Sequence, residues 1–164
     1  METKREIRII TDEPLEPSVE LIRQAFATVA VEMGFTEQNA PRYTAFITKD
    51  RLEDTLRHDG IFWGLFIGSK QAGFVAVQKE PDNKYWMKRL AVLPEYRHGG
   101  SGRALVDTVI NYVCGLGEKK LYLGMVNEET VLKNWYLAMG FKVTTIFNDI
   151  PDLPFTVALM EKDI

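Results

Sequence analysis

The sequence "PEYRHGGSGRALVDTVINYV" (residues 94–113) begins as a proline-led turn and ends as an apolar-striped helix. Three glycines and two basic-capable side chains lie where the helix begins, in the run Arg97, His98, Gly99, Gly100, Ser101 and Gly102. Glycine loses more backbone freedom on folding than any other residue. Its use here therefore indicates either unusual dihedral angles in the turn or a partner that approaches the backbone closely.

A helix start of this kind favours an anion, because its first N–H groups are free and its dipole is positive there. Successive N–H groups can form a nest around phosphate oxygens, and Arg97 and Arg103 can add charge-assisted hydrogen bonds. A plain tight turn into a helix explains the same glycines, so the residues alone leave both readings open. Two known phosphate loops are excluded, because Arg103 and Ala104 stand where a Walker A loop needs Lys and Ser or Thr, and Leu105 stands where a dinucleotide loop needs its third glycine.

Hydrophobic periodicity on either side of this turn predicts the remaining elements. Strands are expected at 5–10, 61–67, 72–80, 85–93, 119–126, 142–147 and 155–162, and helices at 19–33, 43–57, 100–116 and 128–139. Ser18 and Gly34 are the expected caps of the first helix. The order βααβββαβαββ predicts an α/β (α+β) fold in one domain, residues 1–164. Its central mixed sheet should be mostly antiparallel, have six to seven strands and carry helices on both faces, with one parallel pair across residues 85–126.

Composition excludes several classes of protein. A net charge of −3 over 164 residues argues against nucleic acid as the main partner. One cysteine and two histidines provide no zinc-type ligand set, so no metal is expected. The charged N-terminus "METKREIRII" does not read as a signal peptide, and no apolar run is long enough for a membrane helix. We therefore expect a cytoplasmic protein without a membrane partner.

Two segments together resemble the GNAT superfamily of acyl-CoA-dependent N-acetyltransferases. Residues 97–102 match the motif Arg/Gln-x-x-Gly-x-Gly/Ala, and the preceding "LAVLPEYR" (90–97) is typical of the family. Further on, "NWYLAMGFKV" (134–143) is similar to the family's aromatic-Tyr-x-x-x-Gly-Phe segment. The close resemblance covers about residues 84–143, and the order of elements fits the whole chain.

The resemblance implies acetyl-CoA as the co-substrate and a small-molecule or peptide amine as the acceptor, with transfer in a ternary complex. It places the coenzyme A pyrophosphate on the backbone of His98 through Gly102, with Arg97 and Arg103 nearby. It places the pantetheine arm along Leu90, Ala91 and Val92. Dimerisation through exposed strands is also found among relatives, which leaves a homodimer open here.

Tyr136 matches the family's tyrosine that protonates the departing thiolate. A phenol has a pKa near 10 and keeps its proton at neutral pH. The residues alone favour a core aromatic residue of an amphipathic helix, and the match to the family motif is what favours the catalytic role of Tyr136. Asn127 ends its strand where the family offers an amide to the pantetheine, although the family's asparagine position, seven residues before the tyrosine, is Glu129 here.

The chain departs from the family on the strand before the glycine turn, because residues 84–93 contain no carboxylate to serve as general base. The remaining options are a carboxylate from elsewhere, such as Asp149 or Asp152, ordered water, or an acceptor of lower pKa. Lys88 and Arg89 should point to opposite faces of their strand, so one of them should face the acceptor cleft and could hold an acidic acceptor. A snorkelling surface lysine is the alternative.

Three functional hypotheses follow. The first is an acetyl-CoA-dependent N-acetyltransferase. The second is a non-catalytic acyl-CoA-binding sensor, which the missing strand carboxylate favours and Tyr136 disfavours. The third is a phosphate-binding structural domain without coenzyme A.

Overall fold

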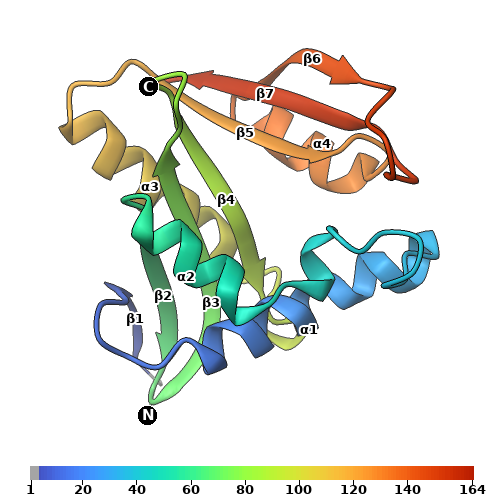
Figure 1. Ribbon diagram of the computed structural model, residues 1–164. Helices are drawn as coiled ribbons and strands as arrows, with labels where there is room; N and C mark the ends of the chain where they lie inside the picture. The colour runs from blue at the N-terminus through green and yellow to red at the C-terminus, as the bar shows by residue number, and fades with distance from the viewer. Residues whose placement is uncertain (1–3) are drawn as a thin grey trace.

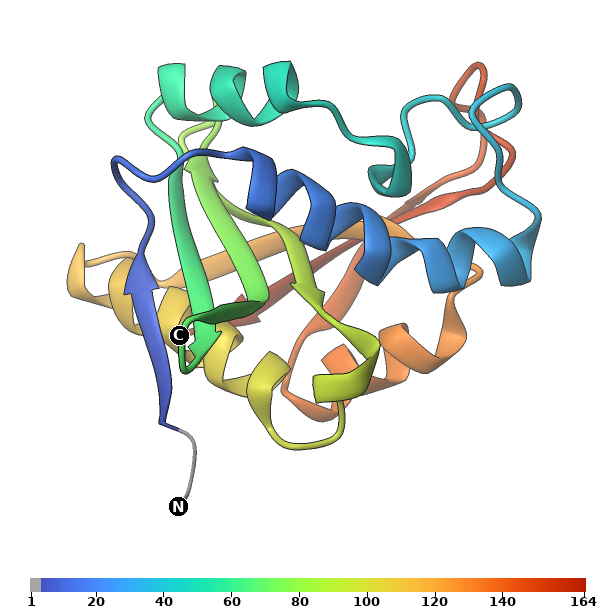
Figure 2. The same ribbon diagram turned by 90° about the horizontal axis from the view of Figure 1, so that it is seen from below.

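The computed structural model describes residues 4–164, which form a seven-stranded sheet between two layers of helices (Figures 1 and 2). The strands are β1 Arg5–Ile9, β2 Ile61–Ile67, β3 Lys70–Lys79, β4 Tyr85–Val92, β5 Lys120–Val126, β6 Lys142–Phe147 and β7 Val157–Asp163. The α-helices are α1 Glu16–Met33, α2 Lys49–Arg57, α3 Ser101–Gly115 and α4 Thr130–Ala138. Short 3₁₀ helices span Thr44–Phe46 and Pro94–Tyr96. The predicted order of elements is confirmed.

The sheet has the strand order β1-β2-β3-β4-β5-β7-β6, and every neighbouring pair is antiparallel except β4 and β5. The predicted parallel pair is therefore confirmed. That β7 lies between β5 and β6 had no sequence signal. Figure 2 shows α1 and α2 on one face of the sheet and α3 and α4 on the other.

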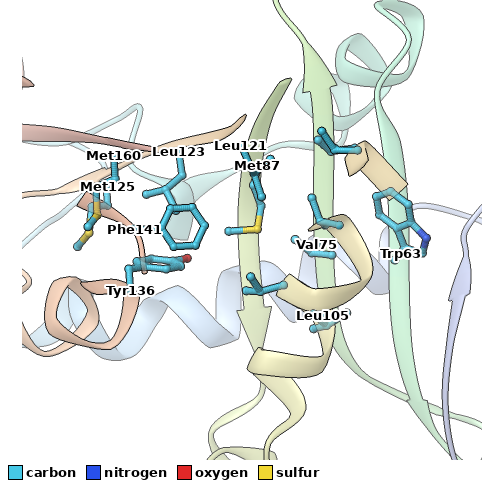
Figure 3. Packing of buried hydrophobic residues seen from close by; sticks show 14 of the residues in the cluster. Trp63, Val75, Met87, Leu105, Leu121, Leu123, Met125, Tyr136, Phe141 and Met160 are labelled. Carbon is cyan, nitrogen blue, oxygen red and sulfur yellow. The ribbon is translucent and has the colours of Figure 1, made fainter. Parts of the chain in front are cut away.

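Helices on both faces explain why β3 is an unbroken buried run rather than an alternating one, since both of its faces meet a core. On one face Leu105 and Val109 of α3 pack against the sheet, together with Tyr136 of α4, as Figure 3 shows in part. On the other face Ile22 of α1 and Leu52 of α2 cover Phe74 and its neighbours. None of the helices within residues 4–164 combines the length and apolar character of a membrane span.

The first helix begins earlier than predicted. It starts at Glu16, with Pro17 in the first turn, where a missing N–H does no harm. Ser18, the expected N-cap, lies inside the helix and is buried. Gly34 caps the C-terminus as predicted, in the left-handed region at φ 71°.

The second helix is shorter than the predicted 43–57. Thr44–Phe46 forms a 3₁₀ turn, and Ile47 and Thr48 are extended before α2 begins. The side chain of Ile47 is fully buried, and its carbonyl accepts a 2.7 Å hydrogen bond from Nε of Arg23. Burial of this apolar residue interrupts the predicted helix. The segment between α1 and α2 therefore runs toward β5 without α-helical structure.

Candidate active site

The sheet opens between β4 and β5. The two strands pair only through Trp86 with Tyr122 and Met87 with Leu123, and beyond these pairs they diverge (Figure 1). The later part of β4, Leu90–Val92, keeps β3 on one side but has no strand on the other among the described residues. Backbone N–H and C=O groups at such an edge need another partner. A thioester arm lying beside β4 can supply it.

A β-bulge at Arg89 marks the point where β4 turns away. Ala76 of β3 pairs with Lys88 and Phe74 pairs with Ala91, so β4 carries one extra residue. Arg89 has φ 55°, an uncommon value for a non-glycine residue. A bulge bends the strand and re-aims its side chains. Strand alternation predicted that Lys88 and Arg89 point to opposite faces and that one of them faces the cleft. This prediction is wrong, because both residues line the same cleft.

The glycine turn has the open backbone that an anion site needs. His98 and Gly100 adopt φ of 66° and 81°, and α3 begins at Ser101 with Gly100 as its N-cap. A Cβ built on Gly99 or Gly100 would meet no atom within 4 Å, so the space outside the turn is free. Free N–H groups, a positive helix end and open space together fit a diphosphate such as that of coenzyme A.

The third glycine of the motif has a different role. A Cβ on Gly102 would lie 3.3 Å from the indole ring of Trp135, so this glycine lets α3 approach α4 closely. Ser101 is buried, and its Oγ accepts a 3.4 Å hydrogen bond from Nη1 of Arg5. Arg103 is exposed in the first turn of α3. The exposed side chain of Arg103, directly after the motif, is accessible for a phosphate contact.

Arg97 holds the turn in place. Its Nε donates to the carbonyl of Val92 at 3.0 Å, and Nη2 donates to the carbonyl of Ala25 at 2.7 Å. These bonds join the turn to the end of β4 and to α1. The expected contact between the Arg97 guanidinium and a pyrophosphate stays a prediction.

Tyr136 lies on α4, with its ring buried against Phe141, while its side chain also lines the cleft. Figure 3 shows its hydroxyl turned toward Met87 of β4. Burial, and then the charge of Glu129, raise the pKa of Tyr136 well above its ordinary value. The phenol therefore stays protonated at neutral pH and is able to donate a hydrogen bond into the cleft.

Asn127 stands at the end of β5, as predicted, but its amide is engaged. Nδ2 donates to Oγ1 of Thr156 at 3.1 Å, and Oδ1 accepts a hydrogen bond from Nζ of Lys133. These contacts join the start of α4 to the segment before β7. The pantetheine contact of Asn127 stays a prediction.

Glu129 is the residue that sequence reasoning missed as a candidate base. It is half-buried at the N-terminus of α4 and lines the same cleft as Tyr136. Burial, and then the charge of Glu32, raise the pKa of Glu129 to about 7, although the positive charge of Arg97 opposes this. The available signal was its position seven residues before Tyr136, on the same face of the helix, which puts both side chains toward β4.

The cleft has a volume of about 210 Å³. Tyr43 also lines it, and the Tyr43 hydroxyl is buried with no hydrogen-bond partner among the described residues. Phe155, from the loop before β7, packs against Tyr43 and lines the same cleft. Asp149 and Asp152, the loop carboxylates considered from the sequence, are exposed, and neither is among the residues that line the cleft. Within residues 4–164, no group of three or more His, Cys, Asp or Glu side chains is arranged to hold a metal ion.

A family model agrees with this geometry. The acetyltransferase (GNAT) domain model matches residues 58–143, more than half of the chain, including the bulged strand, the glycine turn and α4. The chain belongs to the GNAT acetyltransferase family. Acetyl-CoA is the co-substrate of this family, and the open turn described above fits its diphosphate.

Solved structures of several acetyltransferases share this fold. The PaiA N-acetyltransferase from Thermoplasma acidophilum, in complex with coenzyme A, is 22% identical with a TM-score of 0.79, over 98% of this chain and 99% of that chain. The ribosomal-protein-S18-alanine N-acetyltransferase from Escherichia coli is 20% identical with a TM-score of 0.75, over 98% and 94%. A GNAT acetyltransferase from Elizabethkingia anophelis with acetyl-CoA bound is 17% identical with a TM-score of 0.71, over 98% of both chains. A search of curated proteins by sequence found no match.

Proposed function

We propose that this protein transfers the acetyl group of acetyl-CoA directly to a primary amine of a small molecule or a peptide. The observation that carries the proposal is the cleft at the β4–β5 opening, where Tyr136 and Glu129 face the unpaired edge of β4. The diphosphate binds the backbone from His98 to Gly102, with Arg103 close by, and the thioester arm runs along Leu90–Val92 toward the cleft.

Glu129 is the proposed general base. An alkyl ammonium group with a pKa near 10.4 is neutral in less than about one molecule in a thousand at pH 7, so the enzyme must accept its proton. A base works best when its pKa lies near the operating pH, and the pKa of Glu129 is about 7. The carboxylate of Glu129 takes the proton, directly or through water, and leaves the amine nitrogen free to attack.

Transfer then breaks one bond and forms another. The amine nitrogen attacks the carbonyl carbon of the thioester, and a backbone N–H of Leu90–Val92 stabilises the resulting oxyanion. Collapse of the tetrahedral intermediate breaks the C–S bond and forms the amide. The hydroxyl of Tyr136 hydrogen-bonds the departing sulfur and supplies the proton that makes it a thiol. The nitrogen, which is cationic after its attack, loses its second proton through water, and this proton restores the phenol of Tyr136.

The names of similar proteins support nitrogen as the acceptor atom. Two of the three similar structures described above are called N-acetyltransferases, and one name specifies an alanine of a ribosomal protein. A small-molecule acceptor or a peptide acceptor would reach the cleft from the side of α2. A wider cavity of about 1,130 Å³ adjoins the cleft there.

A second candidate is a non-catalytic acyl-CoA-binding sensor. The absence of a carboxylate on β4 favours the sensor, because the family often places its general base on this strand. Glu129 beside Tyr136 in the cleft argues against it, because catalytic sites characteristically place carboxyl groups with a raised pKa in a cleft.

The test is an assay of thiol release from acetyl-CoA with a panel of amines, in parallel with calorimetric titration of coenzyme A. We expect coenzyme A binding and amine-dependent thiol release. Binding of coenzyme A without thiol release from any amine would reject catalysis and support the sensor.

Localisation and assembly are further parts of the proposal. A cytoplasmic location suits an acetyl-CoA-dependent reaction, and fractionation of cells would test it.

Homodimerisation would cover β6, which forms one edge of the sheet and exposes 44% of Ile146 and of Phe147. Light scattering of the wild type and of Phe147→Lys should then show a dimer and a monomer.

A further inference from the structure

The acceptor side of the cleft contains cations that differ in how they are neutralised. Lys88 is already paired, because Nζ forms an ion pair with Glu80 and donates to Oε1 of Gln78 at 2.8 Å. The role of holding an acidic acceptor, considered for Lys88 from the sequence, therefore suits it poorly. The neighbouring Arg89 is a different case.

Arg89 is a half-buried cation whose one side-chain hydrogen bond goes to a neutral group. Nη1 donates to Oγ1 of Thr55 at 2.9 Å, and no carboxylate among the described residues lies within 4 Å of the guanidinium. Burial, and then the charge of Arg51, lower the pKa of Arg89 to about 10, so it is still charged at neutral pH. A desolvated charge of this kind is unfavourable unless an anion joins it.

Two more arginines lie beside the two spaces that Arg89 lines. Nη1 of Arg51 donates to the carbonyl of Arg42 at 3.4 Å, and Nη2 of Arg42 donates to the carbonyl of Pro151 at 3.1 Å. Burial, and then the charge of Arg42, lower the pKa of Arg51. Neither guanidinium forms an ion pair with a described residue. Three like charges thus lie together, bound only to neutral oxygens.

None of the four acidic residues that line the wider cavity, Asp50, Asp54, Asp59 and Glu80, forms an ion pair with these arginines. Asp54 contacts Arg57 and His58, at 3.7 and 3.4 Å. Glu80 contacts Lys88. Both carboxylates act on Arg89 from a distance, but neither forms an ion pair with it. The positive charge of the three arginines is therefore left for a ligand.

The positions of the arginines connect this charge to the reaction site. Arg89 lines both the cleft that contains Tyr136 and the wider cavity beside it. Arg42 lines the cleft and Arg51 lines the cavity. They come from three separate segments: the α1–α2 link, α2 and the bulge of β4. A ligand held by them would extend from the cavity toward the cleft.

We infer that the acceptor is a small amine that carries an oxyanion, a carboxylate or a phosphate, which Arg89, Arg51 and Arg42 hold while the amine reaches Glu129 and Tyr136. Guanidinium groups bind both oxyanions through paired, charge-assisted hydrogen bonds, which fixes orientation as well as position. The inference rests on the proposed acetyltransferase function and specifies the class of substrate.

The experiment compares acceptors that differ only in charge. Thiol release is measured with 4-aminobutyrate and 6-aminohexanoate, with their carboxamides, with phosphoethanolamine and with 1,4-diaminobutane. We expect kcat/KM for the best oxyanion acceptor to exceed that of its uncharged counterpart at least tenfold. A higher value for phosphoethanolamine than for the amino acids would assign a phosphate, and the reverse would assign a carboxylate.

Variants connect the preference to the arginines. Arg89→Gln should lower kcat/KM for the oxyanion acceptor at least tenfold and leave the carboxamide rate nearly unchanged, and Arg89→Lys should recover part of the loss. Arg51→Gln on α2 gives the same comparison at a second arginine of the group. Arg8→Gln on β1, which removes an exposed arginine paired with Glu13, is the control and should change neither rate.

The two proposals fail in different ways. Equal or better acetylation of carboxamides, or a preference that survives both Arg89→Gln and Arg51→Gln, would overturn the anionic acceptor while leaving the acetyltransferase intact. Titration of 6-aminohexanoate and phosphoethanolamine into the coenzyme A complex separates the remaining case. Arginine-dependent binding without thiol release would retain the anion site and reject the reaction, whereas absence of binding and of turnover would overturn the inference.

Discussion

The two sides of the β4–β5 opening are built in different ways. The proposed coenzyme side is one continuous stretch of chain, from Leu90 through the glycine turn to the first turn of α3. The acceptor side is assembled from separate segments: the α1–α2 link, α2, the bulge of β4 and the loop before β7. A site formed by adjacent residues is encoded by local backbone chemistry, whereas a site formed by distant segments depends on how they pack. We expect substitutions on the two sides to separate binding of acetyl-CoA from use of the amine.

The largest expected effect is that of Tyr136→Phe, which removes the hydroxyl that we propose protonates the departing sulfur. The kcat should fall about a hundredfold, since a positioned acid contributes roughly 10²–10⁴-fold. The affinity for coenzyme A should not change. Tyr122→Phe on β5, outside the cleft, is the matched control and should keep wild-type kcat. A wild-type rate for Tyr136→Phe would place that hydroxyl outside the reaction.

Glu129→Gln tests the proposed general base, which accepts the proton of the amine. In the wild type, kcat/KM should rise with pH through about 7 as the carboxyl group of Glu129 loses its proton and becomes able to accept another. The variant should lose this limb and about tenfold or more of kcat/KM at pH 8. Charged groups around Glu129 come from α1, the glycine turn, the α1–α2 link, β4 and α4: Glu32, Arg97, Arg42, Tyr43, Lys88, Arg89, Lys133 and Tyr136. Retention of the limb in the variant would show that another group titrates there.

Gly100→Ala tests the coenzyme side, and Gly117→Ala is its control. Both glycines have φ above 80° and open space at the Cβ position, so each change should destabilise the fold by a similar amount, about 1–2 kcal/mol. Only Gly100→Ala should weaken coenzyme A binding, about tenfold, because the turn at Gly117 lies after α3, away from the site. Calorimetric titration and chemical denaturation measure the two quantities. Equal affinity in both variants would argue against a diphosphate on the turn.

The smallest expected effect is on stability. Because the pKa of Glu129 is higher in the folded state, the folded protein binds more protons between about pH 4.5 and 7, and its free energy of unfolding falls as pH rises through that window. Glu129→Gln should therefore raise the melting temperature at pH 8 more than at pH 5.

Glu128 is the opposite case at the adjacent position. Burial raises the pKa of Glu128, but hydrogen bonds from the backbone and hydroxyl of Thr156 outweigh this and lower it. Its stabilising contribution is present above the unfolded pKa and is lost as pH falls through the folded pKa. Glu128→Gln should lower the melting temperature at pH 8. A shift of the same sign in both variants would contradict the assignment.

The same contrast explains what the sequence predicted. The glycine turn, α3, the parallel pair and the hairpins depend on local signals, and these predictions are confirmed. The start of α2 was missed because burial of Ile47, a tertiary effect, overrides helical periodicity. The bulge at Arg89 was missed because strand alternation assumes that no extra residue is inserted. Glu129 was compared with the family's asparagine and not considered as a base, since the desolvation that raises its pKa comes from packing around the cleft.

The most direct measurement is a crystal structure of the protein with acetyl-CoA. The account predicts that the diphosphate contacts the backbone N–H groups of Gly99–Gly102 and that the pantetheine arm lies along Leu90–Val92, with the thioester carbonyl beside Tyr136 and Glu129. Acetyl-CoA bound elsewhere, with the glycine turn vacant and β4 unpaired, would contradict it.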